Sequence, residues 1–245
     1  MTTTNQQSGT SIVEIADGVY RISTSIPPSA IAIPGGFTFN QFLIAAAEPL
    51  LFHTGMRGLF PLVREAVAHV LPVDTLRYVA FSHHEADEDG SMDEWLAAAP
   101  RAQAVCGRIA ATLQGNELAR PPRALADGEE LSLGDRTVSW IDAPHVPHGW
   151  DCGFMSEART RTLFCGDLFT QPGADAPART EGDILGPSEG MRSAMDYYAH
   201  APHTRATLER LATLEPRTLA CMHGSSYSGD GSQLLRALAD ALTAR

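Results

Sequence analysis

Residues 75–90 read TLRYVAFSHHEADEDG, an apolar run that changes abruptly into histidines and carboxylates. The apolar part is typical of a β-strand, and the loop that follows lies at its carboxyl end, where ligand-binding groups are commonly gathered. Six of the nine residues from 82 to 90 have side chains that can ligate a metal ion. A solvated acidic turn would explain the carboxylates but not the two adjacent histidines, so this loop predicts a metal site.

Three more ligand-type residues follow apolar runs further along the chain. They are His145 in APHVPHG, Asp167 in FCGDLF and His223 in CMHGSS. A single histidine or aspartate at a strand end is more often structural than a ligand. Four strand ends that carry such residues in one chain indicate a common centre instead.

The order of predicted elements gives two β-rich halves, each followed by helices. Strands are expected within 11–26, 38–46, 50–55, 75–84, 102–107, 129–145, 152–167 and 217–224, and helices at 59–71, 91–99, 108–114, 191–200, 203–213 and 233–244. Residues 169–190 show no period. This pattern predicts an α/β protein with a four-layer αβ/βα sandwich rather than a regularly alternating Rossmann fold. We expect a loose tail at 1–10 and a single domain at 11–245.

Composition excludes several classes of function. The formal charge is −11, and all 18 basic residues are arginine, so no lysine is available for a Schiff base or a P-loop. An acidic chain without clustered positive charge also argues against nucleic-acid and anionic-membrane partners. Because neither a secretory signal nor a long apolar span is present, we expect a cytoplasmic protein. The four cysteines are scattered; a Cys152–Cys165 bridge is conceivable, but reduced, buried thiols fit that compartment better.

The combined motif resembles the metallo-β-lactamase superfamily over about residues 11–240. The stretch His83-x-Glu85-x-Asp87 is similar to the oxygen-binding diiron branch, the lactamase-like domain of the flavodiiron proteins. Two positions depart from the superfamily pattern. Glu88 stands where that branch commonly has histidine, and His53 stands where the superfamily normally has aspartate.

The resemblance implies two metal positions. The first would be held by His83, Glu85 and His145, and the second by Asp87 and His223, with Asp167 bridging both. Glu88 either ligates through oxygen or turns away and leaves the second position more open. Asp87 is also a candidate catalytic residue that orients the nucleophile.

Four further residues are expected to lie behind the ligands or to face substrate: His84, His148, His53 and Trp150. Since side chains alternate along a strand, His84 points away from His83. A core position is an equally ordinary role for His53.

The donor chemistry favours two iron ions, with zinc and manganese as alternatives. Counting Glu88, the set has three imidazoles and four carboxylates, whose charge balances two divalent ions. Zinc prefers nitrogen and sulfur donors, whereas carboxylate-rich sets suit harder ions.

Two reactions remain open at this point. The first is hydrolysis of a thioester or ester by a metal-bound hydroxide, with a small acyl substrate, no nucleic-acid or membrane partner, and a homo-oligomer as one assembly. This is the favoured expectation. The alternative, implied by the resemblance, is a non-heme diiron protein that binds or reduces dioxygen or nitric oxide. The lack of a flavodoxin-like segment and the presence of Glu88 count against the alternative.

Overall fold

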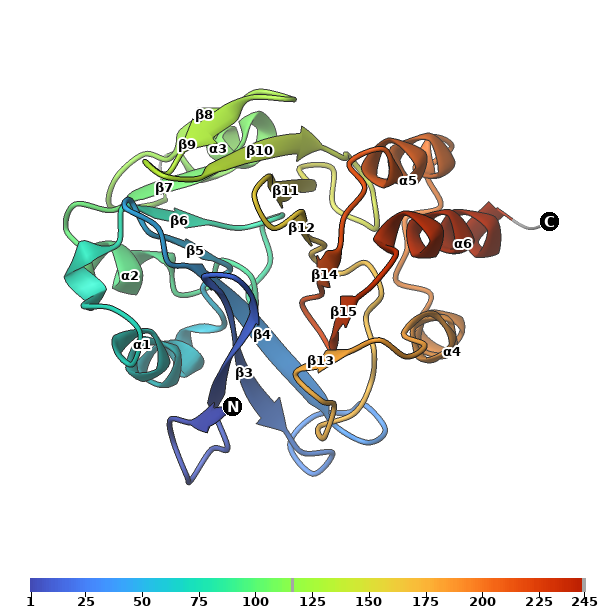
Figure 1. Cartoon of the computed structure of the whole chain (residues 1–245), viewed down its shortest axis with the longest axis horizontal. Coiled ribbons are helices and arrows are strands. Elements are labelled where there is room, and N and C mark those ends of the chain that lie inside the picture. Colours follow the sequence, from blue (N-terminus) through green and yellow to red (C-terminus); the bar gives the residue numbers. More distant parts are fainter. Residues whose placement is uncertain (116, 244–245) are drawn as a thin grey trace.

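The structure is a computed structural model that describes residues 1–115 and 117–243. Two β-sheets face each other at the centre, and helices cover the outer face of each sheet (Figure 1). The expected four-layer αβ/βα sandwich is therefore confirmed. Within the described ranges, no helix has the length and apolar character needed to cross a membrane.

Among the described residues, the first sheet has eight strands in sequential order. They are β1 (Thr2–Thr3), β2 (Ser11–Ala16), β3 (Val19–Ile26), β4 (Phe37–Ile44), β5 (Leu50–Phe52), β6 (Tyr78–Ala80), β7 (Gln103–Gly107) and β8 (Arg123–Leu125). The strands from β5 to β8 are parallel, and the others are antiparallel. Every residue of β4 is buried, because this strand is covered on both faces.

In the part of the chain that the structure describes, the second sheet has seven strands, in the order β13-β15-β14-β12-β11-β10-β9. Their bounds are β9 (Glu130–Ser132), β10 (Thr137–Asp142), β11 (Gly153–Glu157), β12 (Thr162–Phe164), β13 (Arg179–Thr180), β14 (Thr218–Ala220) and β15 (Ser226–Ser228). Strands β10, β12 and β14 run in the same direction, because β11 is antiparallel to both β10 and β12, and β12 is parallel to β14. Their carboxyl ends therefore meet at one edge.

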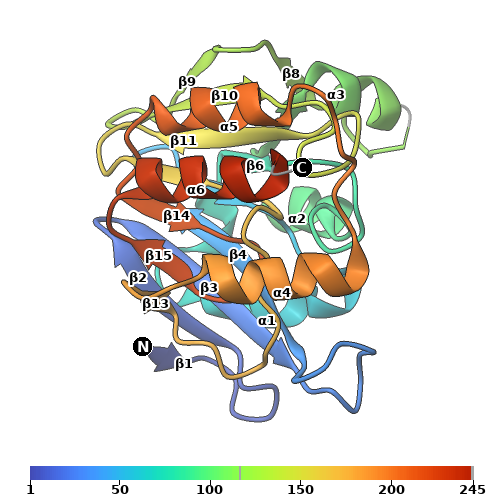
Figure 2. The same ribbon diagram turned by 90° about the vertical axis from the view of Figure 1, so that its right-hand side faces the viewer.

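Within residues 1–115 and 117–243, three α-helices cover each sheet. Helices α1 (Phe60–Ala68), α2 (Met92–Ala98) and α3 (Arg108–Gln114) lie on the first sheet, and α4 (Leu185–Met195), α5 (Thr204–Ala212) and α6 (Gly231–Thr243) lie on the second (Figures 1 and 2). Helix α6 buries Leu235, Leu238 and Ala239, whose spacing places them on one helical face. Two short 3₁₀ turns, Arg57–Leu59 and Val73–Thr75, flank α1.

A core of large side chains joins the two sheets. Phe164 of β12 packs against Phe42 of β4 and Phe52 of β5, with ring centroids 5.6 and 5.1 Å apart. Trp140 of β10 is fully buried in the same layer. This layer holds the carboxyl end of β6 against the second sheet, where Gly153 N donates to Ser82 O at 2.9 Å.

Several local expectations are corrected. Residues 1–10 are not a loose tail: β1 pairs with β2, and the side chains of Thr4 and Thr10 are buried. The helix expected at 191–200 begins earlier, at Leu185, and ends at Met195, since Asp196 adopts a left-handed conformation. Strands β8, β13 and β15 are too short for alternation to reveal. The last position of the expected final helix, residue 244, lies outside the described residues.

Candidate metal centre

The predicted ligand residues come from the carboxyl ends of strands in both sheets. His83, Glu85 and Asp87 follow β6, whereas Asp167 follows β12 and His223 follows β14. The loop after β10 adds His148. The parallel direction of β10, β12 and β14 is what brings distant parts of the sequence to this one edge.

One group of four side chains has the geometry of a metal site, and we call it the first position. His83, Glu85, His148 and Asp167 each offer one donor atom, and these atoms all lie within 4.8 Å of one another. His83 Nε2 lies 3.0 Å from Glu85 Oε2 and 3.1 Å from His148 Nε2. His148 Nε2 lies 3.3 Å from Asp167 Oδ2.

Three side chains form a second position beside it. His223 Nε2 lies 3.3 Å from Asp87 Oδ2 and 3.2 Å from Asp167 Oδ1. The two oxygens of Asp167 therefore face different groups of histidines. This is the geometry that a carboxylate shared by two metal ions requires.

The histidines are oriented from behind. His223 Nδ1 lies 2.8 Å from the carbonyl oxygen of Thr38, and Phe37 stacks on the ring at 3.9 Å. His83 Nδ1 lies 3.1 Å from Ser82 Oγ. A partner at Nδ1 selects the tautomer whose Nε2 lone pair points to the metal side, which is the usual support of a histidine ligand.

Electrostatics also fit a cation at this place. Although burial alone would raise the pKa of Asp167, the imidazoles of His223, His83 and His148 hold it well below its ordinary range. His148 and His83 likewise lower the pKa of Glu85 to about 2. Burial works against a charged His223, but Asp167 and Asp87 outweigh it and raise its pKa to about 10. Protons on these imidazoles occupy the place that a metal ion would take.

An unsatisfied atom supports the fit. Asp167 Oδ1 is buried and makes no hydrogen bond within the described residues, even though His223 Nε2 lies 3.2 Å away. A buried carboxylate oxygen without a donor is costly unless an ion compensates it. The residues present therefore suit a metal centre of mixed imidazole and carboxylate donors.

Residues 37–224 match the family model described as ODP family beta lactamase. The chain belongs to this family. The resemblance to the flavodiiron branch of the metallo-β-lactamase superfamily is thus confirmed.

Three relatives illustrate the family. A diflavin flavoprotein A 1 of Nostoc sp. is 28% identical over 198 residues, covering 77% of this chain and 33% of the relative. The rubredoxin-oxygen oxidoreductase of Megalodesulfovibrio gigas is 27% identical over 209 residues, covering 80% and 50%. The metal-soaked Flv1 flavodiiron core of Synechocystis sp. superposes with a TM-score of 0.82 at 21% identity, covering 95% and 60%, a likeness that shows the fold. The chain spans about a third to a half of the length of these curated relatives.

These relatives overturn the favoured reaction. They are named as flavoproteins and an oxygen oxidoreductase, not as hydrolases, so the expectation of a thioesterase or esterase with an acyl substrate is wrong. Their names give no support to zinc or manganese either. The error arose because a metal-bound hydroxide and an oxygen-binding metal need similar donors, and the donors alone do not identify the reaction.

The structure does not place His145 among the residues of the candidate centre. His145 is exposed, and its backbone N–H donates to Gly149 O at 2.7 Å. His148, which we expected to lie behind the ligands or to face substrate, faces the first position. The turn that starts at Ala143 puts His145 on its outer side and returns the chain inward three residues later. Two histidines in APHVPHG were equally good candidates by type, and only the turn separates them.

Glu88 and the supporting residues also have definite places. Glu88 is fully buried on the far side of His83, away from both positions, and His53 lies beside it. His84 points outward and pairs with Asp89 at 2.7 Å. Trp150 is 54% exposed and does not cover the centre. The four cysteines are buried and unbridged.

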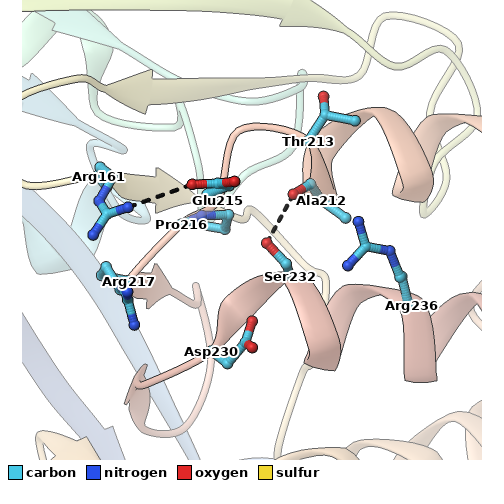
Figure 3. A pocket seen from close by; sticks show the side chains of 9 residues that line it. All are labelled: Arg161, Ala212, Thr213, Glu215, Pro216, Arg217, Asp230, Ser232 and Arg236. Carbon is cyan, nitrogen blue, oxygen red and sulfur yellow. Dashed lines mark hydrogen bonds and ion pairs between the residues drawn. The ribbon is translucent and has the colours of Figure 1, made fainter.

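A separate pocket of about 530 Å³ lies at the opposite ends of β12 and β14 (Figure 3). Arg161 and Arg217 directly precede these strands, whereas the candidate ligands Asp167 and His223 follow them. Arg161 pairs with Glu215 at 3.6 Å, and Ser232 Oγ donates to Ala212 O at 2.8 Å. The pocket is therefore distant from the candidate centre.

Proposed function

We propose that this chain is a non-heme diiron domain that binds or reduces dioxygen, with electrons supplied by a flavin-bearing redox partner. The observation that carries the proposal is the carboxylate Asp167, whose two oxygens face two separate groups of imidazole and carboxylate donors. The presence of Glu85 in place of an imidazole makes the donor set harder and favours iron over zinc.

Iron bound there supplies one-electron chemistry and open coordination positions for a diatomic ligand. His83, Glu85 and His148 would hold it at the first position, Asp87 and His223 at the second, and Asp167 would face both. Nitric oxide is the second diatomic ligand that such a diiron domain could bind, and it is tested in the same way. We propose a flavin-bearing partner because the relatives are named as a diflavin flavoprotein and a rubredoxin-oxygen oxidoreductase.

The chain's own residues shape the surroundings. Phe37 and Phe39 pack against the ring of His223 and limit access of water to that side. The ring of Tyr197 lies 6.0 Å from that of His148, and its hydroxyl donates to the carbonyl oxygen of Asp167 at 3.4 Å. Burial raises the pKa of Tyr197 to about 12, so its hydroxyl keeps its proton beside the centre.

Oxygen uptake by iron-loaded protein tests this function. Protein purified without oxygen and loaded with Fe(II) should consume dioxygen faster than metal-free protein when both receive the same amount of reduced flavin, with a change in visible absorption. A nitric oxide electrode under the same conditions measures the second gas. Protein that retains iron but consumes both gases no faster than the metal-free protein, with no change in its spectrum, would contradict the proposal.

A further inference from the structure

Glu88 is enclosed by donors that hold its carboxylate away from the metal positions. Glu88 Oε2 accepts from the backbone N–H groups of Ser82 at 3.1 Å and of His83 at 2.9 Å. The hydroxyl of Ser82 lies 2.6 Å from Oε2 and 2.8 Å from Oε1. The side chain has no solvent exposure. Its acceptor capacity is thus filled by groups of its own loop.

Two imidazoles complete the surroundings of this carboxylate. His83 Nδ1 lies 3.3 Å from Glu88 Oε2, and His53 Nε2 lies 3.5 Å from the same oxygen. The carboxylate is therefore buried beside His83, on the ring edge opposite to the metal-facing Nε2.

The loop that carries Asp167 closes over this contact. A Cβ at Gly166 would lie 2.6 Å from Ser82 Oγ and 3.6 Å from Glu88 Oε1. Swinging Glu88 toward the second position would remove its buried carboxylate from three donors, the two backbone N–H groups and the Ser82 hydroxyl, and would leave the backbone N–H groups unpaired, which is unfavourable. Glu88 is therefore held where it is by packing as well as by hydrogen bonds.

The two positions consequently differ in their protein donors. The first position has four, from His83, Glu85, His148 and Asp167. The second has three, from Asp87, His223 and the shared Asp167. Both positions have two carboxylates, so they differ by one imidazole, and affinity for divalent ions falls when ligands are fewer.

We propose that Glu88 is the positioning residue of His83 rather than a ligand, and that the two positions therefore bind metal unequally, the first tightly and the second weakly. The inference rests on the proposed metal centre, not on its reaction with oxygen. A carboxylate behind a histidine ligand fixes the ring and strengthens the donor, which assigns Glu88 to the first position.

Stepwise loading measures the inequality. Metal-free protein is titrated with Fe(II) in the absence of oxygen by calorimetry, and the metal retained after desalting is determined by elemental analysis. We expect one retained ion per chain and a second ion bound at least about tenfold more weakly. Two ions retained with equal affinity would overturn the proposal.

Variants of Glu88 and Asp87 separate positioning from ligation. Glu88→Gln should weaken the tight step about 10–100-fold and leave the weak step unchanged, because it alters support for His83 only. Asp87→Asn, the matched control, should abolish the weak step and spare the tight one. Loss of the weak step alone in Glu88→Gln would mean that Glu88 is a ligand, and the proposal would be wrong.

A second variant guards against misfolding. Ser82→Ala removes one hydroxyl that holds Glu88 and should weaken the tight step in the same direction by a smaller factor. Circular dichroism of each metal-free variant confirms that it folds, and the ratio of the two affinities is a readout that general destabilisation does not change selectively. Failure to bind any Fe(II) refutes the proposed function itself, whereas equal binding of two ions with oxygen uptake refutes only this inference.

Discussion

Among single residues, Asp167 and His148 are the two on which the candidate centre depends most. Asp167 faces both positions through its two oxygens, and His148 meets the first through Nε2. His145, of the same type and only three residues earlier, is exposed. Position in the turn, not residue type, decides which imidazole meets the carboxylate.

This pair of histidines gives a matched test. His148→Ala should reduce iron retained at the first position by at least about tenfold in affinity, because one of four donors is lost. His145→Ala should retain iron as the wild type does. Elemental analysis after desalting measures both. Equal iron loss in the two variants would show that the loop as a whole, rather than His148, supports the metal.

The protonation of His223 predicts a pH dependence of the metal-free protein. Its pKa is raised from 6.5 to about 10 because Asp167 and Asp87 outweigh burial. For a base with a raised folded pKa, the stabilisation is complete below 6.5 and is lost as the pH rises to about 10. The free energy of unfolding of the metal-free wild type should therefore fall across this window more steeply than that of His223→Gln. Urea unfolding at several pH values measures both slopes, and parallel slopes would contradict the expectation.

Among the secondary-structure elements, strand β4 of the first sheet is hydrogen-bonded to the loop that contains His223. Asn40 Nδ2 donates to the carbonyl oxygens of Cys221 and Gly224, each at 2.9 Å, and Asn40 is fully buried. The backbone of Thr38 on the same strand accepts from the ring of His223. One strand thus positions a histidine that is about 180 residues away in sequence.

Loss of the hydrogen bonds from Asn40 to this loop should change both the stability and the metal affinity of the protein. Asn40→Ala leaves two buried carbonyl groups without their donor and should lower the free energy of unfolding by about 1–3 kcal/mol. The weak step of metal binding should be reduced further, since the loop of His223 loses its anchor. Thr112→Ala, at an exposed threonine of helix α3 whose hydroxyl donates to Arg108 O, is the control and should change stability by less than about 0.5 kcal/mol. An Asn40→Ala protein as stable as the control would refute the anchoring role.

At the scale of the whole molecule, each sheet supplies half of the centre. His83, Glu85 and Asp87 belong to the first sheet, and His148, Asp167 and His223 belong to the second. Their separation depends on the core between the sheets, where Phe164 contacts Phe42 and Phe52. Packing distant from the metal should therefore influence metal binding.

Phe164→Leu tests this dependence. The shorter side chain should lower the free energy of unfolding by about 1–2 kcal/mol and weaken iron binding, because the sheets can shift relative to one another. Leu208→Ala, in the layer between the second sheet and its helices, should destabilise the fold by about 2–5 kcal/mol with little effect on the affinity of the folded protein for iron. Equal affinities in both variants would show that the core does not set the metal geometry.

Much of this architecture is legible in local pattern. The apolar run before Ser82 predicts a strand, and the spacing of Leu235 and Leu238 predicts a helix, because both depend on neighbours in sequence. Strands as short as β13 and β15 are not predicted from the sequence, because two or three residues show no period. Helix α4 starts six residues before the expected helix at 191–200, because its first turn contains Gly186 and Pro187, which are not typical of a helix.

Motifs and periodicity are properties of adjacent residues, so the family, the four-layer fold and the residue types available for a metal centre follow from the amino-acid sequence alone. Which side chains meet depends on how the chain folds in three dimensions. The tertiary structure selected His148 over His145, turned Glu88 toward Ser82 and His83, and aimed the two oxygens of Asp167 at different histidines. The physical reason is that these contacts arise between loops of two sheets, and their geometry depends on how the sheets pack rather than on any local pattern.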